Sequence, residues 1–357
     1  MHLLIAQDHG KRLTMSSEVV KAWPMNKPAP DAAPCRLVAV VVTHNRLLEV
    51  QTTLSRLLDS PPDELAAVVV FENASTDGTE SYLSALETQD ARVDVLRSTV
   101  NVGGAGGFEQ GMRHAVATYE PDWLVVMDDD GRPDTGTLSR FHEQDRSSAH
   151  GWGAACYYPN NGEICDINRP SINPFWNRSA LRRTLLGEGR NGFHLGAEAY
   201  ASKEVRDIDG ASFVGLFISR AGIALAGYPD GELFIYGDDV LYTLKMRALG
   251  GRILFDPALR FEHNFSSHSK DLQRFNPLWK SYYHHRNLLM VYRLCAGVWF
   301  VLVLPTAAIK WLLKARHYKG QRLRYAMLVL RALRDGVLSR KGVHHEAVLR
   351  WSREQKH

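Results

Sequence analysis

Three consecutive carboxylates, Asp128, Asp129 and Asp130, follow the apolar run 123–127 and carry the clearest chemistry in this chain. A short, continuous apolar run of this kind is typical of a strand buried in a parallel sheet. Adjacent carboxylates repel one another unless a cation lies among them, and hard oxygen ligands suit Mg²⁺ or Mn²⁺. Because such a metal keeps positions open for phosphate oxygens, the motif predicts a metal–diphosphate site at the carboxyl end of a strand. The alternative is a solvated acidic turn at Asp130-Gly131.

Two further groups downstream could act on a substrate. Asp238 and Asp239 stand at the predicted start of a helix, where neighbouring side chains point about 100° apart. One of them can cap the helix while the other faces a crevice, and a carboxylate beside a sugar hydroxyl would be a general base. His263 follows the next predicted strand and could complete a metal site with one Asp of the triplet. The alternatives are two capping acids and a structural histidine.

Polar loops follow each of the first four predicted strands. Because the carboxyl ends of parallel strands meet at one edge of a sheet, these loops should line a single crevice. In chain order they are Thr43–Arg46, Glu72–Thr79, Asn101–Phe108 and the acidic triplet.

The residue types in these loops favour an anionic ligand. A cation at a helix start, such as Arg46, is disfavoured by the helix dipole, which indicates that it meets a phosphate or a base. The glycines from Gly103 to Gly107 allow a close backbone approach to a ligand, although they could also form a flexible connector. The dinucleotide pattern GxGxxG fails because position 109 is Glu, which argues against a nicotinamide or flavin enzyme.

The elements that must position these residues alternate between strand and helix patterns. Such alternation predicts an α/β fold with a mainly parallel sheet flanked by helices, while residues 150–205 look less regular. Strands are predicted at Leu37–Thr43, Ala67–Phe71, Val93–Leu96, Trp123–Met127, Ser212–Ser219 and Arg252–Phe255. Helices are predicted at Leu47–Leu58, after Gly78, at Phe108–Thr118 and after Asp239.

Charge is unevenly distributed along the 357 residues. Residues 293–357 hold 14 Lys and Arg against 3 Asp and Glu, a net charge of +11 that leaves −7 for the rest of the chain. The same tail contains 16 uncharged residues from Leu294 to Ile309, short of the roughly 20 that a spanning helix needs. Apolar and aromatic residues next to Lys and Arg favour a helix that lies on anionic lipid. A core helix followed by a solvated basic helix is the alternative, and the acidic body argues against nucleic acid.

These features divide the chain into three parts. Residues 1–35 are expected to be a flexible extension, because four prolines fall between positions 24 and 34. Residues 36–290 are expected to form the catalytic domain, and residues 291–357 a basic, helical, membrane-associating tail. The four cysteines contain no CxxC pair, so neither a zinc site nor a disulfide framework is indicated.

Taken together and in this order, the motifs resemble those of the inverting family-2 glycosyltransferases with a GT-A fold. The resemblance covers roughly residues 36–290 and is closer to the bacterial galactofuranosyltransferases of the galactan-initiating type. It rests on Asn101–Phe108, Asp128–Pro133, Leu233–Val240 and Tyr283–Asn287. The fold it implies is a mixed, mainly parallel sheet flanked by helices.

The resemblance also implies a role for each motif residue. Asp239 would be the catalytic base, with Asp238 and Asp209 binding the acceptor. Asp130 and His263 would ligate Mn²⁺ or Mg²⁺. The nucleotide-sugar donor would be held by Thr43, Asn45, Arg46, Glu72, Asn73, Asn101, Gly103, Gly104, Asp128 and Asp129.

There are two departures from the family pattern. Glu72 replaces the usual Asp, which puts one contact to the base or ribose in doubt. The paired tryptophans of the polymerising galactofuranosyltransferases are absent near Asp209, which argues for a different acceptor site.

The activity implied is metal-dependent transfer of galactofuranose from UDP-galactofuranose to a hydroxyl of a cell-surface glycan, either polyprenyl-diphosphate-linked or of another kind. The enzyme would act at the cytoplasmic face of the cell membrane. One alternative is a rhamnosyltransferase that uses dTDP-rhamnose with the same fold and mechanism. Another is a non-catalytic, membrane-associated protein that binds nucleotide sugars.

Overall fold

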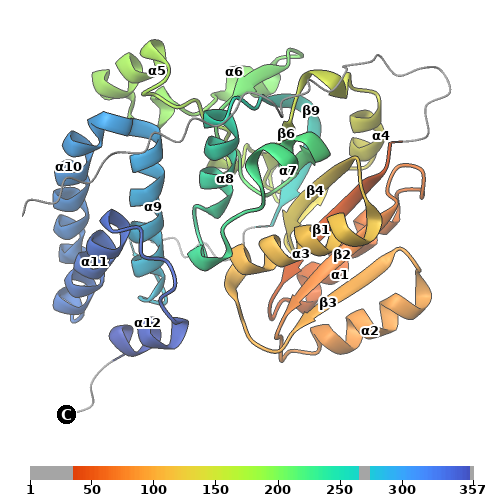
Figure 1. The fold of residues 1–357 in the computed structure, drawn as a ribbon, viewed down its shortest axis with the longest axis horizontal. Coiled ribbons are helices and arrows are strands. Elements are labelled where there is room, and N and C mark those ends of the chain that lie inside the picture. The colour runs from red at the N-terminus through yellow and green to blue at the C-terminus, as the bar shows by residue number, and fades with distance from the viewer. Residues whose placement is uncertain (1–34, 265–273, 354–357) are drawn as a thin grey trace, which may run out of the picture. The chain divides into compact units, whose positions relative to one another are not determined.

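The computed structural model describes residues 35–264 and 274–353. The extension predicted at residues 1–35 therefore lies outside the described residues, apart from Cys35. Residues 34–357 form one compact unit. It contains a mixed sheet with helices on both faces. The C-terminal helices form a separate group beside this sheet (Figure 1).

The sheet has nine strands, and its N-terminal half is parallel as predicted. β1 (Leu37–Thr43) lies between β2 (Ala67–Asn73) and β4 (Trp123–Asp128), and β3 (Val93–Ser98) forms the edge beyond β2. β4 then pairs antiparallel with β8, and the order continues through β6 and β9 to β5, while β7 pairs with β9. These strands are β5 (Gly131–Pro133), β6 (Gly151–Tyr157), β7 (Arg206–Ile208), β8 (Leu216–Ser219) and β9 (Ile253–His263).

The apolar strand β1 is buried on both faces, and its alternate side chains belong to two separate cores. Leu37, Ala39 and Val41 pack in the cluster that contains the buried residues of α1 (Leu47–Leu58). Val38, Val40 and Val42 pack in the cluster that contains those of α3 (Gly103–Tyr119). A strand covered by helices on both faces has no polar side to alternate with, which is why it reads as a continuous apolar run.

Helix α3 begins at Gly103, five residues before its predicted start at Phe108. The glycines thus form its first two turns, and the expectation of a glycine-rich loop there is wrong. A Cβ on Gly107 would lie 2.6 Å from Val42 and one on Gly111 would lie 2.8 Å from Val40. Their absence lets the helix approach β1 closely.

The second half of the sheet departs further from the predicted boundaries. β8 begins four residues after Ser212, because the chain reaches it through Gly215 with φ +75°. β9 continues well past the predicted end at Phe255 and reaches His263. β6 lies in the segment expected to be irregular, since its Gly-Trp-Gly-Ala-Ala-Cys-Tyr sequence has few strand-forming residues.

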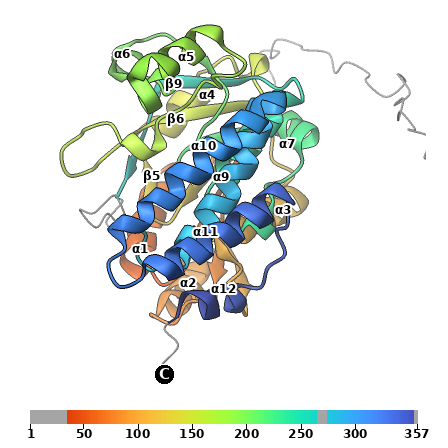
Figure 2. The ribbon, with the colours of Figure 1, turned by 90° about the vertical axis from the view of Figure 1, so that its left-hand side faces the viewer.

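The remaining helices of the sheet domain are short, and the C-terminal ones form a group of their own. The former are α2 (Thr79–Gln89), α4 (Thr137–His142), α5 (Arg178–Arg183), α6 (Ala197–Ala201), α7 (Arg220–Ala226) and α8 (Asp238–Ala248). The latter are α9 (Lys280–Ala296), α10 (Phe300–Leu313), α11 (Arg322–Val337) and α12 (His345–Ser352). α9, α10 and α11 pack around a buried cluster that includes Tyr282, Trp311 and Tyr325 (Figure 2).

Gly103 and Gly104 provide a matched pair for testing the close approach at the start of α3. Gly103 has φ +77° and a Cβ there would lie 2.1 Å from the carbonyl oxygen of Phe234, whereas a Cβ on Gly104 would meet no heavy atom within 4 Å. Gly103→Ala is therefore expected to lower the free energy of unfolding by about 1–3 kcal/mol, and Gly104→Ala to leave it unchanged or raise it slightly. Urea unfolding of both variants measures this, and equal effects would contradict it.

Candidate active site

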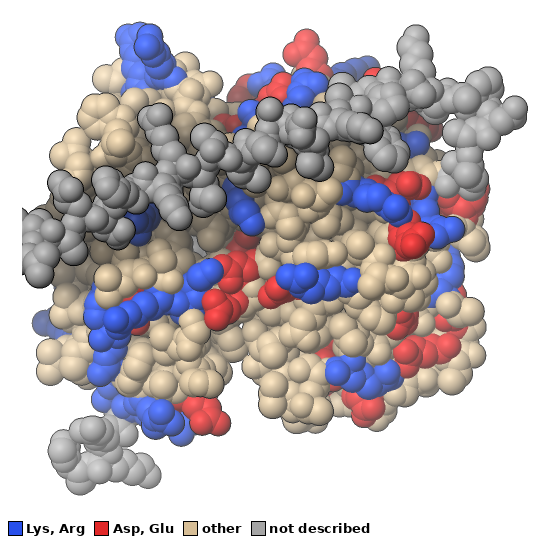
Figure 3. All heavy atoms as spheres, viewed as in Figure 1, with Lys and Arg blue, Asp and Glu red and all other residues tan. Residues whose placement is uncertain are grey.

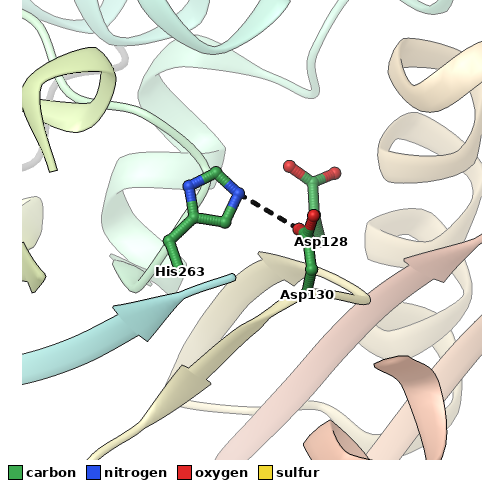
Figure 4. A group of neighbouring side chains, drawn as sticks. All are labelled: Asp128, Asp130 and His263. Carbon is green, nitrogen blue, oxygen red and sulfur yellow. Dashed lines mark hydrogen bonds and ion pairs between the residues drawn. The ribbon is translucent and has the colours of Figure 1, made fainter. Parts of the chain in front are cut away.

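The acidic triplet and His263 meet because of one strand pairing. β4 ends at Asp128 and β5 begins at Gly131, so Asp129 and Asp130 form the turn between them. β5 pairs antiparallel with the end of β9, which sets Gly131 opposite His263. The His263 Nε2 and Asp130 Oδ1 atoms are consequently 3.1 Å apart (Figure 4).

Asp128, Asp130 and His263 could hold a divalent cation. One ligand atom from each lies within 4.8 Å of the others. Asp130 and His263 are buried and Asp128 is half-buried, so a cation there would keep an open side. Two carboxylates and one imidazole suit Mn²⁺ or Mg²⁺ with further oxygen ligands from a substrate. Asp130 and His263 match the predicted metal ligands, and Asp128, predicted to contact the donor, joins them.

The electrostatics of the triplet also favour a cation. Burial and the neighbouring charge of Asp130 raise the pKa of Asp128 to about 7. Burial raises the pKa of Asp129 to about 7 as well, although Arg46 opposes that rise. Burial also acts against ionisation of Asp130, but His263 and Arg46 outweigh it and hold its pKa below the usual value. The three adjacent carboxylates are thus only partly compensated by Arg46 and His263, which would favour a metal ion among them.

His263 is oriented by a residue that sequence reasoning missed. Its Nδ1 lies 2.7 Å from Asn168 Oδ1, an oxygen that can only accept, so Nδ1–H donates and Nε2 points to the carboxylates. Asn168 is itself fixed by a hydrogen bond from its Nδ2 to Ser212 Oγ at 2.9 Å. Such an outer partner fixes the tautomer of a metal-binding histidine. No local signal marks Asn168, because it is 95 residues away in the chain.

Arg46 lies against the triplet. Its Nη1 is 3.3 Å from Asp129 Oδ1 and also pairs with Asp130. In this structure Arg46 neutralises carboxylates next to where a diphosphate would bind. Its contact with a phosphate or base stays a prediction. Its guanidinium remains partly exposed, since its side chain keeps 27% of its accessible surface.

The predicted donor loops converge at the same edge of the sheet and are tied to one another. Asn73 Oδ1 accepts the N–H of Val102 at 2.9 Å, and its Nδ2 donates to Gly103 O at 3.1 Å and to Asn101 Oδ1 at 3.2 Å. Asn101 Oδ1 also accepts the N–H of Gly103, the residue before Gly104. These bonds fix the loop between β3 and α3 against the end of β2.

The first two loops are connected in a similar way. Thr43 and Glu72 are register partners at the ends of β1 and β2, and both are buried. Glu72 Oε1 accepts the N–H of Ser75 at 2.6 Å, so this carboxylate closes its own turn. Asn45 Oδ1 accepts the N–H of Thr76 at 2.6 Å. Direct contacts of these residues with a nucleotide remain a prediction.

Asp238 and Asp239 are the first two residues of α8, with Asp238 buried and Asp239 half-buried. Asp239 Oδ1 accepts the N–H of Val240 at 2.7 Å, and burial raises the Asp239 pKa to about 6. The charge of Asp239 is one of the smaller causes of the raised pKa of Asp128. A carboxyl group with a pKa near 6 is mostly ionised at neutral pH and can still accept a proton, as a general base requires.

Asp209 is held by protein groups in this structure. Its Oδ1 accepts from Arg247 Nε at 2.8 Å and its Oδ2 accepts the N–H of Asn173 at 2.8 Å. Gly210, the next residue, lies beside Val240 at the start of α8. The predicted acceptor contact of Asp209 therefore competes with an ion pair, and it stays a prediction.

The loop before α8 is held by the C-terminal helix α9, a role that the sequence did not reveal. Asn287 Nδ2 lies within 3.0 Å of the carbonyl oxygens of Leu233, Ile235 and Tyr236. The fully buried Arg286 donates to Leu233 O at 2.9 Å. Phe234 and Tyr236 have φ of 68° and 70°, which is unfavourable for such side chains and needs this support. The motif Tyr283–Asn287 thus shapes the loop that presents Asp238 and Asp239.

Known proteins are similar in sequence to parts of this chain. Residues 38–184 match the family model Glycosyl transferase family 2. Galactofuranosyltransferase GlfT1 of Mycolicibacterium smegmatis is 32% identical over 206 residues, which are 57% of this chain and 62% of that protein. Undecaprenyl-phosphate mannosyltransferase of Micrococcus luteus is 29% identical over 174 residues, 49% of this chain and 70% of that protein. The match thus spans less than two thirds of the length of the first relative.

The fold has a counterpart among solved structures. Mannosyltransferase PcManGT from Pyrobaculum calidifontis, in complex with GDP-Man and Mn²⁺, aligns with a TM-score of 0.50 at 18% identity, over 88% of this chain and 90% of that chain. The prediction of a GT-A fold, a mixed sheet flanked by helices with a C-terminal helical tail, is confirmed.

Asn168 offers a test of the metal site that needs no turnover. Asn168→Ala removes the hydrogen bond that orients His263, and loss of such an outer partner weakens metal affinity about 10- to 100-fold. Titration calorimetry with Mn²⁺ on the purified chain measures it. The exposed Asn160, substituted by Ala, is the matched control and should bind as the unaltered chain does. Unchanged affinity in Asn168→Ala would contradict the assignment of His263 as a ligand.

Proposed function

We propose that this protein is a hexosyltransferase that moves galactofuranose from UDP-galactofuranose to a sugar hydroxyl of a lipid-linked glycan. The match of residues 38–184 to the model Glycosyl transferase family 2 supports this reaction class. The observation that carries this proposal is the cluster of Asp128, Asp130 and His263, whose ligand atoms lie within 4.8 Å of one another. Transfer from a nucleotide sugar requires a diphosphate site and a base, and Asp239 at the start of α8 is proposed as the base. The similarity to galactofuranosyltransferase GlfT1 supports galactofuranose as the sugar.

In the proposed reaction the protein positions the two substrates and moves one proton. Asp239 accepts the proton of the acceptor hydroxyl while the hydroxyl oxygen attacks the anomeric carbon, in line with the departing UDP. The new glycosidic bond forms as the bond between that carbon and the diphosphate oxygen breaks, and the anomeric configuration inverts. A divalent cation at Asp128, Asp130 and His263 would supply charge neutralisation for the leaving diphosphate. The linked loops around Asn73 and Asn101 would keep the donor in a fixed orientation.

The protein is further proposed to act at the cytoplasmic face of the cell membrane. The helical run Lys280–His317 is, by length and composition, long and apolar enough to cross a membrane, and only 22% of its most apolar window is buried. The similarity to undecaprenyl-phosphate mannosyltransferase supports an acceptor carried on a polyprenyl lipid. Basic residues around this run would favour anionic lipid.

A panel of donors tests the sugar and the metal together. Purified protein with Mn²⁺ and a membrane lipid extract is expected to release UDP from UDP-galactofuranose but not from UDP-galactopyranose, and EDTA should abolish the release. Turnover with dTDP-rhamnose or GDP-mannose instead would keep the reaction class and refute galactofuranose. Absence of turnover with every donor, in a protein that binds UDP, would favour the non-catalytic alternative.

Asp239→Asn tests the base. The amide keeps the shape of the side chain but cannot accept the proton, so kcat is expected to fall at least about 100-fold. UDP binding by calorimetry should remain unchanged, because Asp239 does not hold the nucleotide in this mechanism. Asp63→Asn, at an exposed position, is the control for removing one charge. Retained turnover in Asp239→Asn would refute the assignment.

A further inference from the structure

A projection between β6 and β7, residues 176–190, exposes large apolar side chains. Leu185 and Leu186 keep 75% and 72% of their accessible surface, and Trp176 keeps 45%. Adjacent exposed leucines are unfavourable in water and indicate a surface that contacts a protein or a membrane. This projection belongs to neither the catalytic cluster nor the basic tail.

The local structure of the projection holds the two leucines at its tip. α5 runs into a single wide turn, Thr184–Glu188, in which Gly187 reverses the chain with φ of 106°. A Cβ placed on Gly187 or on Gly189 would meet no heavy atom within 4 Å. Among the described residues, therefore, none lies close to the outer side of Gly187 or Gly189, next to the exposed Leu185 and Leu186.

Positive charge surrounds this apolar tip. Arginines occupy four positions of the projection against one acid, Glu188. They are Arg178, Arg182, Arg183 and Arg190. Figure 3 shows Lys and Arg side chains in blue at the upper left, where Figure 1 places α5. An apolar tip with a basic surround is complementary to an anionic lipid surface, in which leucines enter the acyl boundary and arginines meet the headgroups.

The segment that leads into the projection is tied to the end of α9. Asn173, just before it, donates through Nδ2 to the carbonyl oxygen of Cys295 at 3.2 Å, at the end of α9. Figures 1 and 2 both place α5 next to the point where α9 gives way to α10. The exposed apolar side chains there include Val298, with 86% of its surface accessible, and Val301, with 70%.

The outward face of α10 has the same chemistry as the projection. Its further exposed apolar residues are Leu302, Ile309 and Leu313. From Gly297 to Lys319 the chain carries four basic residues and no acidic one. Both elements thus pair exposed aliphatic side chains with an excess of positive charge.

We propose that the 176–190 projection and α10 together form one surface that docks on an anionic membrane. This inference rests on the proposed function, because it places the enzyme at the lipid that carries its acceptor. A second copy of the chain fits the surface less well, since a twofold contact would set arginines against arginines. Two separate contact points also fix the orientation of the protein on the membrane, which a single helix would leave free to rotate.

Vesicle flotation of the full chain tests the proposal. Vesicles of phosphatidylcholine with about 30% phosphatidylglycerol are expected to bind the protein, and vesicles of phosphatidylcholine alone to bind it weakly. Leu185→Ser combined with Leu186→Ser should weaken binding about tenfold or more, because two buried side chains are lost. Arg182→Gln combined with Arg183→Gln should reduce the preference for the anionic vesicles. Leu249→Ser, at an exposed leucine that follows α8, is the control and should bind normally.

Each outcome decides the matter. Normal flotation of the Leu185→Ser, Leu186→Ser variant would overturn the proposal. No flotation of the unaltered chain, with a dimer in sedimentation velocity that this variant abolishes, would assign the surface to a second copy instead. UDP binding should be unchanged in the variant, so that a misfolded protein is recognised. Failure of the proposed function would be distinct, because flotation would then persist without turnover with any donor.

Discussion

The pairing of β5 with β9 is the constraint on which the candidate active site depends. It converts a turn of three acidic residues into a site, because it sets His263 opposite Gly131 and next to Asp130. Without that register the imidazole would lie elsewhere, and the triplet would be an acidic turn with Arg46 beside it. Charges at this density are tolerated in a buried place only where opposite charge is fixed among them. The strand register supplies one such partner, while burial still raises the pKa values of Asp128 and Asp129.

The loop before α8, which presents the proposed base, is fixed from a distant part of the chain. Arg286 and Asn287 hold carbonyl oxygens of the segment that presents Asp238 and Asp239, and the carbonyl oxygen of Phe234 in turn accepts the N–H of Ala105 at 3.1 Å. The start of α3, the loop before α8 and helix α9 are therefore one connected unit. A base positioned in this way needs little reorganisation when the substrates bind. The backbone strain at Phe234 and Tyr236 is the cost of that geometry.

The parallel half of the fold could be predicted from the sequence because its signals are local. Continuous apolar runs mark β1, β2 and β4, and polar residues mark the edge at which they end. For His263 the residues themselves left a structural role open, and the family resemblance favoured a metal ligand, since the pairing of β5 and β9 spans about 130 residues and leaves no periodicity to detect. Asn168 and Asn287 act through long-range hydrogen bonds, which no local pattern encodes. The helix start at Gly103 was missed for a different reason: glycine is a poor helix former, and it is suitable there because Gly103 packs against Phe234 and Gly107 against β1.

Helix α9 connects the loop that presents the proposed base to the helix that is proposed to contact the membrane. Its middle carries Arg286 and Asn287, which shape the catalytic loop, and its end leads into α10, whose apolar face is exposed. A helix is stiff over the length from Arg286 to Ala296, so docking of α10 on a lipid surface, as proposed, would set the orientation of the loop that presents Asp239. An acceptor that diffuses in the plane of a membrane would then reach the base from a defined side. The physical demand on such an enzyme is thus a fixed angle between the lipid surface and the catalytic edge of the sheet, and the contact between Asn173 and the end of α9 ties the second apolar element to that same helix.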